Sequence, residues 1–527
     1  MQKIELYDTT LRDGSQAEEI SFSIEDKLII VQELDHLGID YIEGGYPGSN
    51  PKDVEFFDKV KQIDLIHAKV VPFGSTHKAN ISAEKDENLL ALMNTEFDTV
   101  TIFGKSWILH VTDVLGISLE HNLKLIEDSV SFLTKNGRNV IFDAEHFFDG
   151  YEADKDYAMK TLKAAINGGA QCLVLCDTNG GTMPLRIQKI IEETRECFSD
   201  LPLGIHAHND AGMAVANSII AVQSGVSHVQ GTFNGYGERC GNANLCSIIP
   251  NLKFKLNIDC VTDNQLREFT RVSRLISELA NLAHDERQPY VGKSAFAHKG
   301  GMHIDAVRKT DGRACEHVKP VSVGNERRLL ISDQAGTSAI VMKLEHEYPN
   351  LDRRSPEVKK IFAQLKEAEL EGYQYEGAEA SFELLTRKAL KDYEPFFNLL
   401  GFRVIIEKFE NGTIHSEATI KVKDPNGEME HTASDGDGPV NALDRALRKA
   451  LDKFYPELSK VHLTDYKVRV LDTKAGTGAK VRVLIESGDG EKVWGTVGVS
   501  ENIIEASWQA LADSIEYKLF KDRKKSR

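Results

Sequence analysis

Short apolar runs alternate with longer helical patterns over residues 1–255, and this alternation constrains the fold more than any other feature of the chain. Each run is rich in Val, Ile, Phe or Leu and is bounded by Gly, Asp or Asn, which is typical of buried parallel strands. The eight runs are "KIELYD", "DYIEGGYP", "HAKVVPFG", "DTVTIFG", "NVIFDAE", "QCLVLCDT", "LGIHAH" and "HVQGTF". Eight repeats of strand and helix predict a (β/α)8 barrel, with a doubly wound open sheet as the alternative.

The helical patterns between these runs carry start and stop signals. In "SIEDKLIIVQELDHLG", Ser23 suits the N-cap, Asp26 stands at the third helical position, and Gly38 suits the stop. The pattern therefore predicts a capped helix between the first two strands.

The chain changes character twice after the predicted barrel. Residues 256–395 lose the strand pattern and predict helical linker subdomains, with helices in "NQLREFTRVSRLISELANLAH" and "SPEVKKIFAQLKEAELEG" around a glycine-rich loop, "FAHKGGMH". Strand-like alternation returns over residues 396–527, which predict a C-terminal α+β domain.

This C-terminal segment contains an internal repeat with an offset of about 64 residues. "ENGTIHSEATIKV" resembles "KAGTGAKVRVLIE", and the same offset aligns Ala442 and Ala446 with Ala506 and Ala510. Each copy predicts three strands and a helix, and one copy alone has too little core to be stable. Neither copy contains a catalytic constellation, which favours an assembly or effector-binding role.

Charge and cysteine content exclude several classes of protein. The formal net charge of -17 argues against nucleic-acid and anionic-membrane partners, because both require a basic face. No secretory signal begins the chain, and no apolar run approaches the ~20 residues of a membrane span. The seven cysteines are scattered without a CxxC pair, which predicts reduced thiols and a cytoplasmic location.

Polar residues follow the predicted strands, at the end of a barrel where active sites form. They are Arg12, Asp13 and Gln16 after the first strand, Asp143, Glu145 and His146 at the fifth, Asp177 and Thr178 after the sixth, His206 and His208 at the seventh, and Glu238, Arg239 and Asn242 after the eighth.

The two histidines of "HAHND" stand two residues apart, so their side chains point to the same side of a strand. With a carboxylate from the first strand end, they suit a divalent metal that keeps open positions. The alternative is a hydrogen-bonded strand-end histidine beside a chance neighbour. The additional carboxylate and amide after the first and last strands favour the metal, whose identity could be Zn, Mn, Co or Mg.

Four motifs together carry a family resemblance along the whole chain: "LYDTTLRDGSQ", "HAHND", "GYGERCGNAN" and "FAHKGGMH". They resemble the acyl-CoA condensing enzymes of the 2-isopropylmalate, homocitrate and citramalate synthase group. "EGGYPGSNPKD" and "FDAEHFFDGY" look most like the citramalate branch, which joins acetyl-CoA to pyruvate on the way to isoleucine. The resemblance implies a metal-containing barrel, a helical linker, and a C-terminal regulatory domain under feedback control by an amino acid.

The resemblance also implies roles for particular residues. The metal ligands would be Asp13, His206 and His208, with Asn242 as a fourth. The metal would hold the 2-oxo acid by its keto and carboxylate oxygens and polarise the carbonyl.

Four further roles follow from the same resemblance. Arg12 would stabilise the developing alkoxide, and Thr178 would hold the substrate carboxylate. Glu145 and His303 are the candidates for the base that deprotonates acetyl-CoA. Because His303 comes from the neighbouring subunit in this family, a homodimer is expected. Cys315 stands where relatives often have a tyrosine, so another residue takes that role or the alignment differs there.

Three alternatives share part of this pattern. A 2-isopropylmalate or homocitrate synthase would run the same chemistry on a larger 2-oxo acid. A lyase like hydroxymethylglutaryl-CoA lyase would run the reverse cleavage, but it lacks a duplicated C-terminal domain. A non-catalytic amino-acid sensor would not need the Asp13, His206 and His208 set.

The expected effector of the C-terminal domain is isoleucine. Glycine-rich turns are predicted before each repeat helix, in "SDGDGP" and "GTVGVS", where backbone N–H groups could receive a carboxylate. The alternative is a dimerisation module without a ligand.

Overall fold

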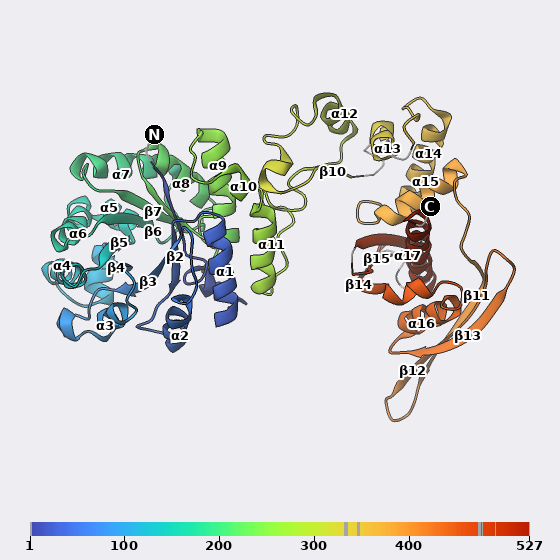
Figure 1. The fold of residues 1–527 in the computed structure, drawn as a ribbon, viewed down its shortest axis with the longest axis horizontal. Helices are drawn as coiled ribbons and strands as arrows, with labels where there is room; N and C mark the ends of the chain where they lie inside the picture. The colour runs from blue at the N-terminus through green and yellow to red at the C-terminus, as the bar shows by residue number, and fades with distance from the viewer. Residues whose placement is uncertain are drawn as a thin grey trace. The chain divides into compact units, whose positions relative to one another are not determined.

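The computed structural model describes residues 3–330, 336–344, 348–472, 476, 478–490 and 492–525 (Figure 1). The chain forms two compact units, one of Met1–Phe296 with Val318–Arg327 and one of Ala297–His317 with Arg328–Arg527. In the described ranges, no helix is both long and apolar enough to cross a membrane.

The first unit contains a closed barrel of parallel strands, as predicted. Its strands are β1 (Glu5–Asp8), β2 (Tyr41–Gly45), β3 (Lys69–Ser75), β4 (Thr99–Lys105), β5 (Asn139–Glu145), β6 (Cys172–Asp177), β7 (Leu203–Ala207) and β8 (His228–Gly231). Each strand pairs with the next, and β1 pairs with β8 from Glu5 opposite His228 to Asp8 opposite Gly231. This last pairing closes the ring and excludes the open sheet. Tyr7 and Val174 are among the buried side chains that fill the barrel interior.

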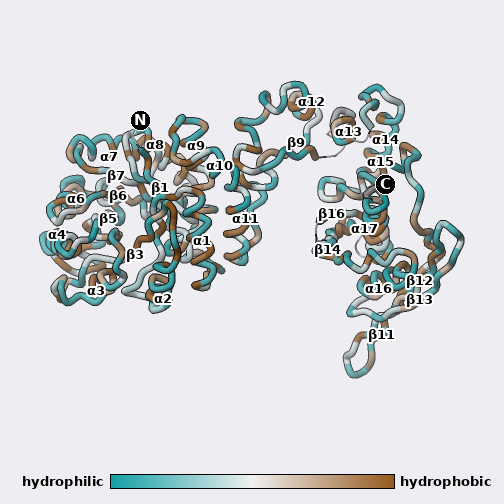
Figure 2. Tube along the Cα trace, in the orientation of Figure 1, coloured by the Kyte–Doolittle hydropathy of each residue, from teal (hydrophilic) through white to brown (hydrophobic). Residues whose placement is uncertain are grey.

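Helices surround these strands (Figure 1). They are α1 (Ile24–His36), α2 (Pro51–Val60), α3 (Glu87–Asn94), α4 (Leu119–Lys135), α5 (Phe147–Ala153), α6 (Lys155–Gly168), α7 (Pro184–Cys197), α8 (Ala214–Gln223) and α9 (Leu245–Leu256), followed by α10 (Asp263–Leu266) and α11 (Phe269–Leu279). Ser23 and Asp26 form the predicted capping box of α1, and Gly38 follows its end with a φ of 82°. Figure 2 shows hydrophobic residues along the barrel strands, and these pack against one face of each helix.

The region after the barrel is largely helical, as predicted. It contains α12 (Gly301–Thr310), α13 (Gly336–Leu344), α14 (Pro356–Glu371) and α15 (Glu379–Leu390), with a two-stranded sheet of β9 (Ala297–His298) and β10 (Arg328–Leu329). The expectation of a loop throughout "FAHKGGMH" was wrong, because its end forms the first turn of α12. Gly300 is the N-cap, so the paired glycines mark the helix start instead of breaking it.

The C-terminal segment consists of two βββα repeats, as predicted. The first is β11 (Asn398–Lys408), β12 (Ile414–Lys423), β13 (Met429–Gly436) and α16 (Pro439–Leu451), and the second is β14 (His462–Val470), β15 (Val481–Gly488), β16 (Val493–Ser500) and α17 (Ile503–Lys525). The matched elements β11 and β14, β13 and β16, and α16 and α17 begin 64 residues apart. The four aligned alanines are fully buried, which allows each helix to approach its sheet closely. Residues 474, 475 and 477 of the repeated stretch lie outside the described part.

Only one of the two predicted glycine turns exists. In "SDGDGP", β13 ends at Gly436 and Gly438 is the N-cap of α16. "GTVGVS" belongs to β16, where an added Cβ on Gly498 would lie 2.0 Å from the Ala506 carbonyl oxygen. Close helix packing therefore explains that glycine. The start of α17 is capped by Asn502, whose Oδ1 accepts the Ile504 N–H at 2.8 Å. This N–H group is therefore already hydrogen-bonded and does not need a ligand carboxylate.

Candidate functional site

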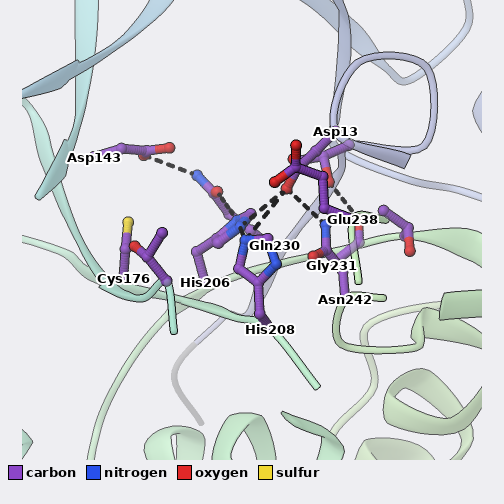
Figure 3. Close-up of polar contacts among 12 residues, drawn as sticks. Asp13, Asp143, Cys176, His206, His208, Gln230, Gly231, Glu238 and Asn242 are labelled. Carbon is purple, nitrogen blue, oxygen red and sulfur yellow. Dashed lines mark hydrogen bonds and ion pairs between the residues drawn. The ribbon is translucent and has the colours of Figure 1, made fainter. Parts of the chain in front are cut away.

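Three buried side chains from distant parts of the chain meet at the carboxyl end of the barrel (Figure 3). Asp13 lies in a tight turn after β1, where the Arg12 and Gly14 N–H groups both bond the Thr9 carbonyl. His206 is on β7 and His208 follows it. Their Nε2 atoms are 3.3 Å apart and lie 3.2 Å and 3.8 Å from Asp13 Oδ2. This arrangement of two imidazoles and a carboxylate fits a divalent cation.

Asn242 adds an amide to the group. The loop after β8 folds back along β7, with the Ala243 N–H bonded to the Ala207 carbonyl and a bridge between His208 and Asn242. Asn242 Nδ2 donates to Asp13 Oδ2 at 2.7 Å, whereas its buried Oδ1 has no hydrogen-bond partner among the described residues. A buried amide oxygen without a donor suits a cation ligand, so the residues present fit a metal.

The charges of the group differ in a way that also suits a cation. Burial raises the pKa of Asp13, but the Arg12 guanidinium and His206 outweigh it and hold that pKa well below its usual range. Burial, reinforced by His206, lowers the pKa of His208 to about 3. These shifts favour an ionised Asp13 and a neutral His208, the forms that bind a metal. Burial lowers the pKa of His206, but the contact with Asp13 outweighs it and raises that pKa, so a cation would have to displace a proton from His206.

Gln230 orients the His206 ring, and Asp143 in turn holds Gln230. Gln230 on β8 lies with its Oε1 2.9 Å from His206 Nδ1, and its Nε2 donates to Asp143 Oδ1 at 3.2 Å (Figure 3). The His206 Nδ1–H therefore donates to Gln230, so a cation bound beside Asp13 would meet the lone pair of Nε2. Gln230 is fully buried and was not among the residues predicted from the sequence, although an amide inside the apolar run "HVQGTF" pointed to a buried hydrogen-bond partner.

Arg12 is held on three sides. Its Nη1 lies 3.2 Å from Asp13 Oδ1, its Nε donates to Glu43 Oε1 at 2.5 Å, and its guanidinium carbon stacks 3.7 Å from the centre of the Phe73 ring. The fully buried Glu43 on β2 also accepts the Tyr7 hydroxyl at 2.7 Å. Glu43 was a second missed residue, although a carboxylate inside the run "DYIEGGYP" pointed to a buried partner.

These groups open into a cavity of about 310 Å³ at the barrel mouth. Its lining includes Arg12, Asp13, Glu145, Thr178, His206 and His208, together with the aromatic rings of Tyr46, Phe73 and Phe103. Glu145 ends β5 and forms an ion pair with Lys105 at the end of β4. The Thr178 hydroxyl oxygen accepts the His146 N–H at 2.9 Å. The structure thus gathers predicted residues of the first, fifth, sixth and seventh strand ends around one space, together with Glu238 and Arg239 from the loop after β8.

His303 is not among the described residues that line this cavity. It is exposed on α12, in the second compact unit. Cys315 lies in the same unit, with its Sγ 3.8 Å from the His303 carbonyl oxygen. The predicted roles of these two positions remain predictions.

Known families match three successive parts of the chain. Residues 3–276 match the HMGL-like family, and residues 290–372 match the homocitrate synthase post-HMGL domain-like family. Residues 376–519 match the LeuA allosteric (dimerisation) domain.

Curated relatives match nearly the whole chain. The (R)-citramalate synthase of Geobacter sulfurreducens is 57% identical, with 99% of this chain and 98% of that protein covered. The (R)-citramalate synthase of Aquifex aeolicus is 52% identical with the same coverage. The probable 2-isopropylmalate synthase of Methanopyrus kandleri is only 30% identical, over 97% of this chain and 98% of that protein. The chain therefore belongs to the (R)-citramalate synthase family.

Proposed function

We propose that this protein is an acyltransferase that condenses acetyl-CoA with pyruvate and water to give (R)-citramalate and CoA, the first step of the pyruvate route to isoleucine. The observation that carries this proposal is the similarity over nearly the whole chain to proteins named (R)-citramalate synthase, at 57% and 52% identity. The site supports it, because a 2-oxo acid presents two oxygens that suit a cation and a guanidinium. A 2-isopropylmalate or homocitrate synthase remains the alternative, with the same chemistry on another 2-oxo acid.

Asp13, His206, His208 and the Asn242 Oδ1 would hold a divalent metal. Zn, Mn, Co and Mg are all compatible with such oxygen and nitrogen ligands. When bound, the metal supplies Lewis-acid polarisation of the 2-oxo carbonyl. The support from the chain itself is the burial of all four side chains and the Asn242 amide oxygen, which accepts no hydrogen bond from the part of the chain that the structure describes.

Arg12 stabilises the negative charge that develops on the carbonyl oxygen of pyruvate. Although burial opposes the charged form, Glu43 and Asp13 raise the pKa of Arg12, so the guanidinium stays cationic throughout the cycle. Thr178, with its oxygen already accepting the His146 N–H, keeps its own hydroxyl proton to donate to the substrate carboxylate.

Glu145 and His303 are the proposed acid–base pair. One removes a methyl proton from acetyl-CoA, and the resulting carbanion equivalent attacks the carbonyl carbon of pyruvate. Water then cleaves the thioester and releases CoA, which makes the condensation effectively irreversible. His303 acts from the neighbouring subunit in this proposal, so the active form is a homodimer. The match to a domain described as allosteric and dimerising supports that assembly.

Isoleucine is the proposed feedback inhibitor, bound by the C-terminal repeats. The duplicated βββα module and the match to a LeuA allosteric domain support this regulatory role. A cytoplasmic location is also proposed, and it is supported by seven cysteines that are all free thiols.

A CoA-release assay across a panel of 2-oxo acids tests the proposed reaction. Pyruvate is expected to give the highest kcat/KM, ahead of 2-oxoisovalerate and 2-oxoglutarate, with (R)-citramalate identified by chiral chromatography. Preference for 2-oxoisovalerate or 2-oxoglutarate would move the function to one of the two alternatives. Absence of CoA release with every acid would contradict the condensation itself.

A further inference from the structure

Thr178 is held between two residues with unusual backbones. His146 donates its backbone N–H to Thr178 Oγ1 at 2.9 Å, and Arg239 Nη2 donates to the Thr178 carbonyl oxygen at 2.8 Å. Both His146 and Arg239 have a φ of 56°, in the left-handed region that side chains with a Cβ rarely adopt. Left-handed residues other than glycine persist only where the surroundings hold them, and they concentrate at functional sites.

The side chain of His146 supplies that hold. The residue is 8% exposed, its Nδ1 lies 3.2 Å from Asp149 Oδ2, and its ring centre lies 4.2 Å from that of His110 and 5.6 Å from that of Trp107. These three partners fix the imidazole, and the fixed imidazole fixes the backbone to which it is attached.

The consequence reaches Glu145 as well, because one peptide unit joins it to His146. The Glu145 carbonyl accepts the Ser106 N–H at 3.1 Å, beyond the end of β4, while the His146 N–H bonds Thr178 beyond the end of β6. The peptide is therefore tied to both neighbouring strand ends. These two hydrogen bonds fix the position from which the Glu145 side chain enters the cavity. They also fix the direction in which the Thr178 hydroxyl can donate its proton.

We infer that His146 is a positioning residue for pyruvate, acting through Thr178 and Glu145 without touching the substrate. The inference rests on the proposed condensation and adds to it a residue outside the predicted catalytic set. A shift of the 145–146 peptide would misdirect the hydroxyl that receives the substrate carboxylate, and small misplacements of this kind cost ~10- to 100-fold in rate.

The test compares His146→Ala, His146→Asn and a matched control in the full-length, metal-loaded enzyme. Alanine removes the ring but retains a Cβ in the left-handed conformation, whereas asparagine tolerates that conformation and keeps a short polar group beside Asp149. Glu96→Ala is the control, because Glu96 has a φ of 63° in the turn before β4, at the opposite end of the barrel. The expected result is a rise of about tenfold or more in the pyruvate KM for His146→Ala, partial recovery in His146→Asn, and no change in Glu96→Ala.

Two further readouts separate positioning from loss of structure. The acetyl-CoA KM and the metal content of His146→Ala should match wild type. The double variant with Thr178→Val should lose less kcat/KM than the two single losses multiplied together, because both changes disturb the same hydroxyl. An unchanged pyruvate KM in His146→Ala, or additive effects in the double variant, would overturn the inference. If His146→Ala does not fold, His146→Asn with Thr178→Val makes the same comparison. Wild-type CoA release with pyruvate in the same assay tests the proposed function separately, so the two failures are distinguishable.

Discussion

Gln230 Oε1 lies 2.9 Å from His206 Nδ1, at the side of the imidazole opposite the Nε2 atom that faces Asp13. This hydrogen bond selects the tautomer that leaves Nε2 free for a cation. Gln230→Met keeps the volume and removes the acceptor, so we predict a metal affinity ~10- to 100-fold lower than wild type. Competition titration with a metal chelator measures this directly.

The matched control is Asn325→Leu. This change removes another buried amide, which lies away from the site and donates to the carbonyls of Tyr290 and Gly292. Equal metal affinities in Gln230→Met and wild type would contradict the orienting role.

His206→Ala and His208→Ala are predicted to lose metal and activity together while the barrel remains folded. Each change removes one of the three clustered ligand groups. Elemental analysis of the purified variants and far-UV circular dichroism check the two parts of the prediction. His228→Gln serves as the control, since His228 is a buried histidine at the start of β8, away from the strand ends that form the site. Full metal content with near-normal turnover in either alanine variant would exclude the proposed ligand set.

Glu145→Gln and His303→Ala are predicted to lower kcat by ~10²-fold or more with metal retained, as expected for the loss of an acid–base group. Steady-state kinetics on metal-loaded enzyme provide the measurement. Wild-type kcat in either variant removes that residue from the mechanism.

Mixing these two variants tests whether His303 acts across subunits. In a co-expressed population, half of the dimers are hybrids, and each hybrid holds one site with both wild-type groups. We therefore predict about a quarter of wild-type activity from two nearly inactive chains. No recovery in hybrids that are verified as mixed dimers would place His303 in the site of its own chain or outside the reaction.

The buried Glu516 on α17 should make the stability of the C-terminal module depend on pH. Burial raises the pKa of Glu516 to about 7, although its oxygens accept the Phe396 N–H at 3.1 Å and 3.3 Å. A carboxyl whose folded-state pKa is raised binds its proton more tightly in the native state, so its contribution is present at low pH and is lost as pH rises through about 7.

Glu516→Gln keeps an acceptor for Phe396 and cannot ionise. We predict that the unfolding free energy of wild type falls relative to this variant by up to about 3 kcal/mol between pH 5 and pH 8. Urea unfolding followed by the fluorescence of Trp494 and Trp508, both in the module, gives the two curves. Glu501→Gln, at an exposed carboxyl before α17, is the control. A constant difference between wild type and Glu516→Gln across this range would contradict the prediction.

Millimolar isoleucine is predicted to inhibit the full-length enzyme by binding its less active conformation more tightly, with a coupling typically of 1–3 kcal/mol. Initial-rate measurements with leucine and valine as comparison ligands check this. A chain cut near Leu390 is unsuitable for the purpose, because Phe382 and Ala389 of α15 are buried in one cluster with Val497 and Val499 of β16. Insensitivity to isoleucine would leave the module with a dimerisation role alone.

Local patterns were sufficient to predict the barrel, the capping of α1 and the two βββα repeats. Periodicity and capping depend on neighbours in sequence, and Ser23 and Asp26 are three residues apart. The Asp13, His206 and His208 set was predictable for a related reason, since the carboxyl ends of barrel strands share one face.

The supporting residues were not predictable in the same way. Gln230 and Glu43 are single polar residues inside apolar runs. Gln230 contacts His206, and Glu43 contacts Arg12, only because of where their strands lie around the closed barrel, and this position is not visible in the local sequence. "GTVGVS" was mistaken for a turn because Gly495 makes room for the backbone before α15 and Gly498 makes room for α17, tertiary requirements that composition does not reveal.

The pairing of β1 with β8 also has a consequence for how the enzyme matures. Asp13 and Asn242 are 229 residues apart in sequence and meet only when the first strand finds the last. In a nascent chain that has not yet delivered β8, the proposed ligand Asn242 would be missing from the group, so the proposed cation could not reach its final coordination. Metal uptake during refolding would therefore follow ring closure, and its time course would show when the barrel is completed.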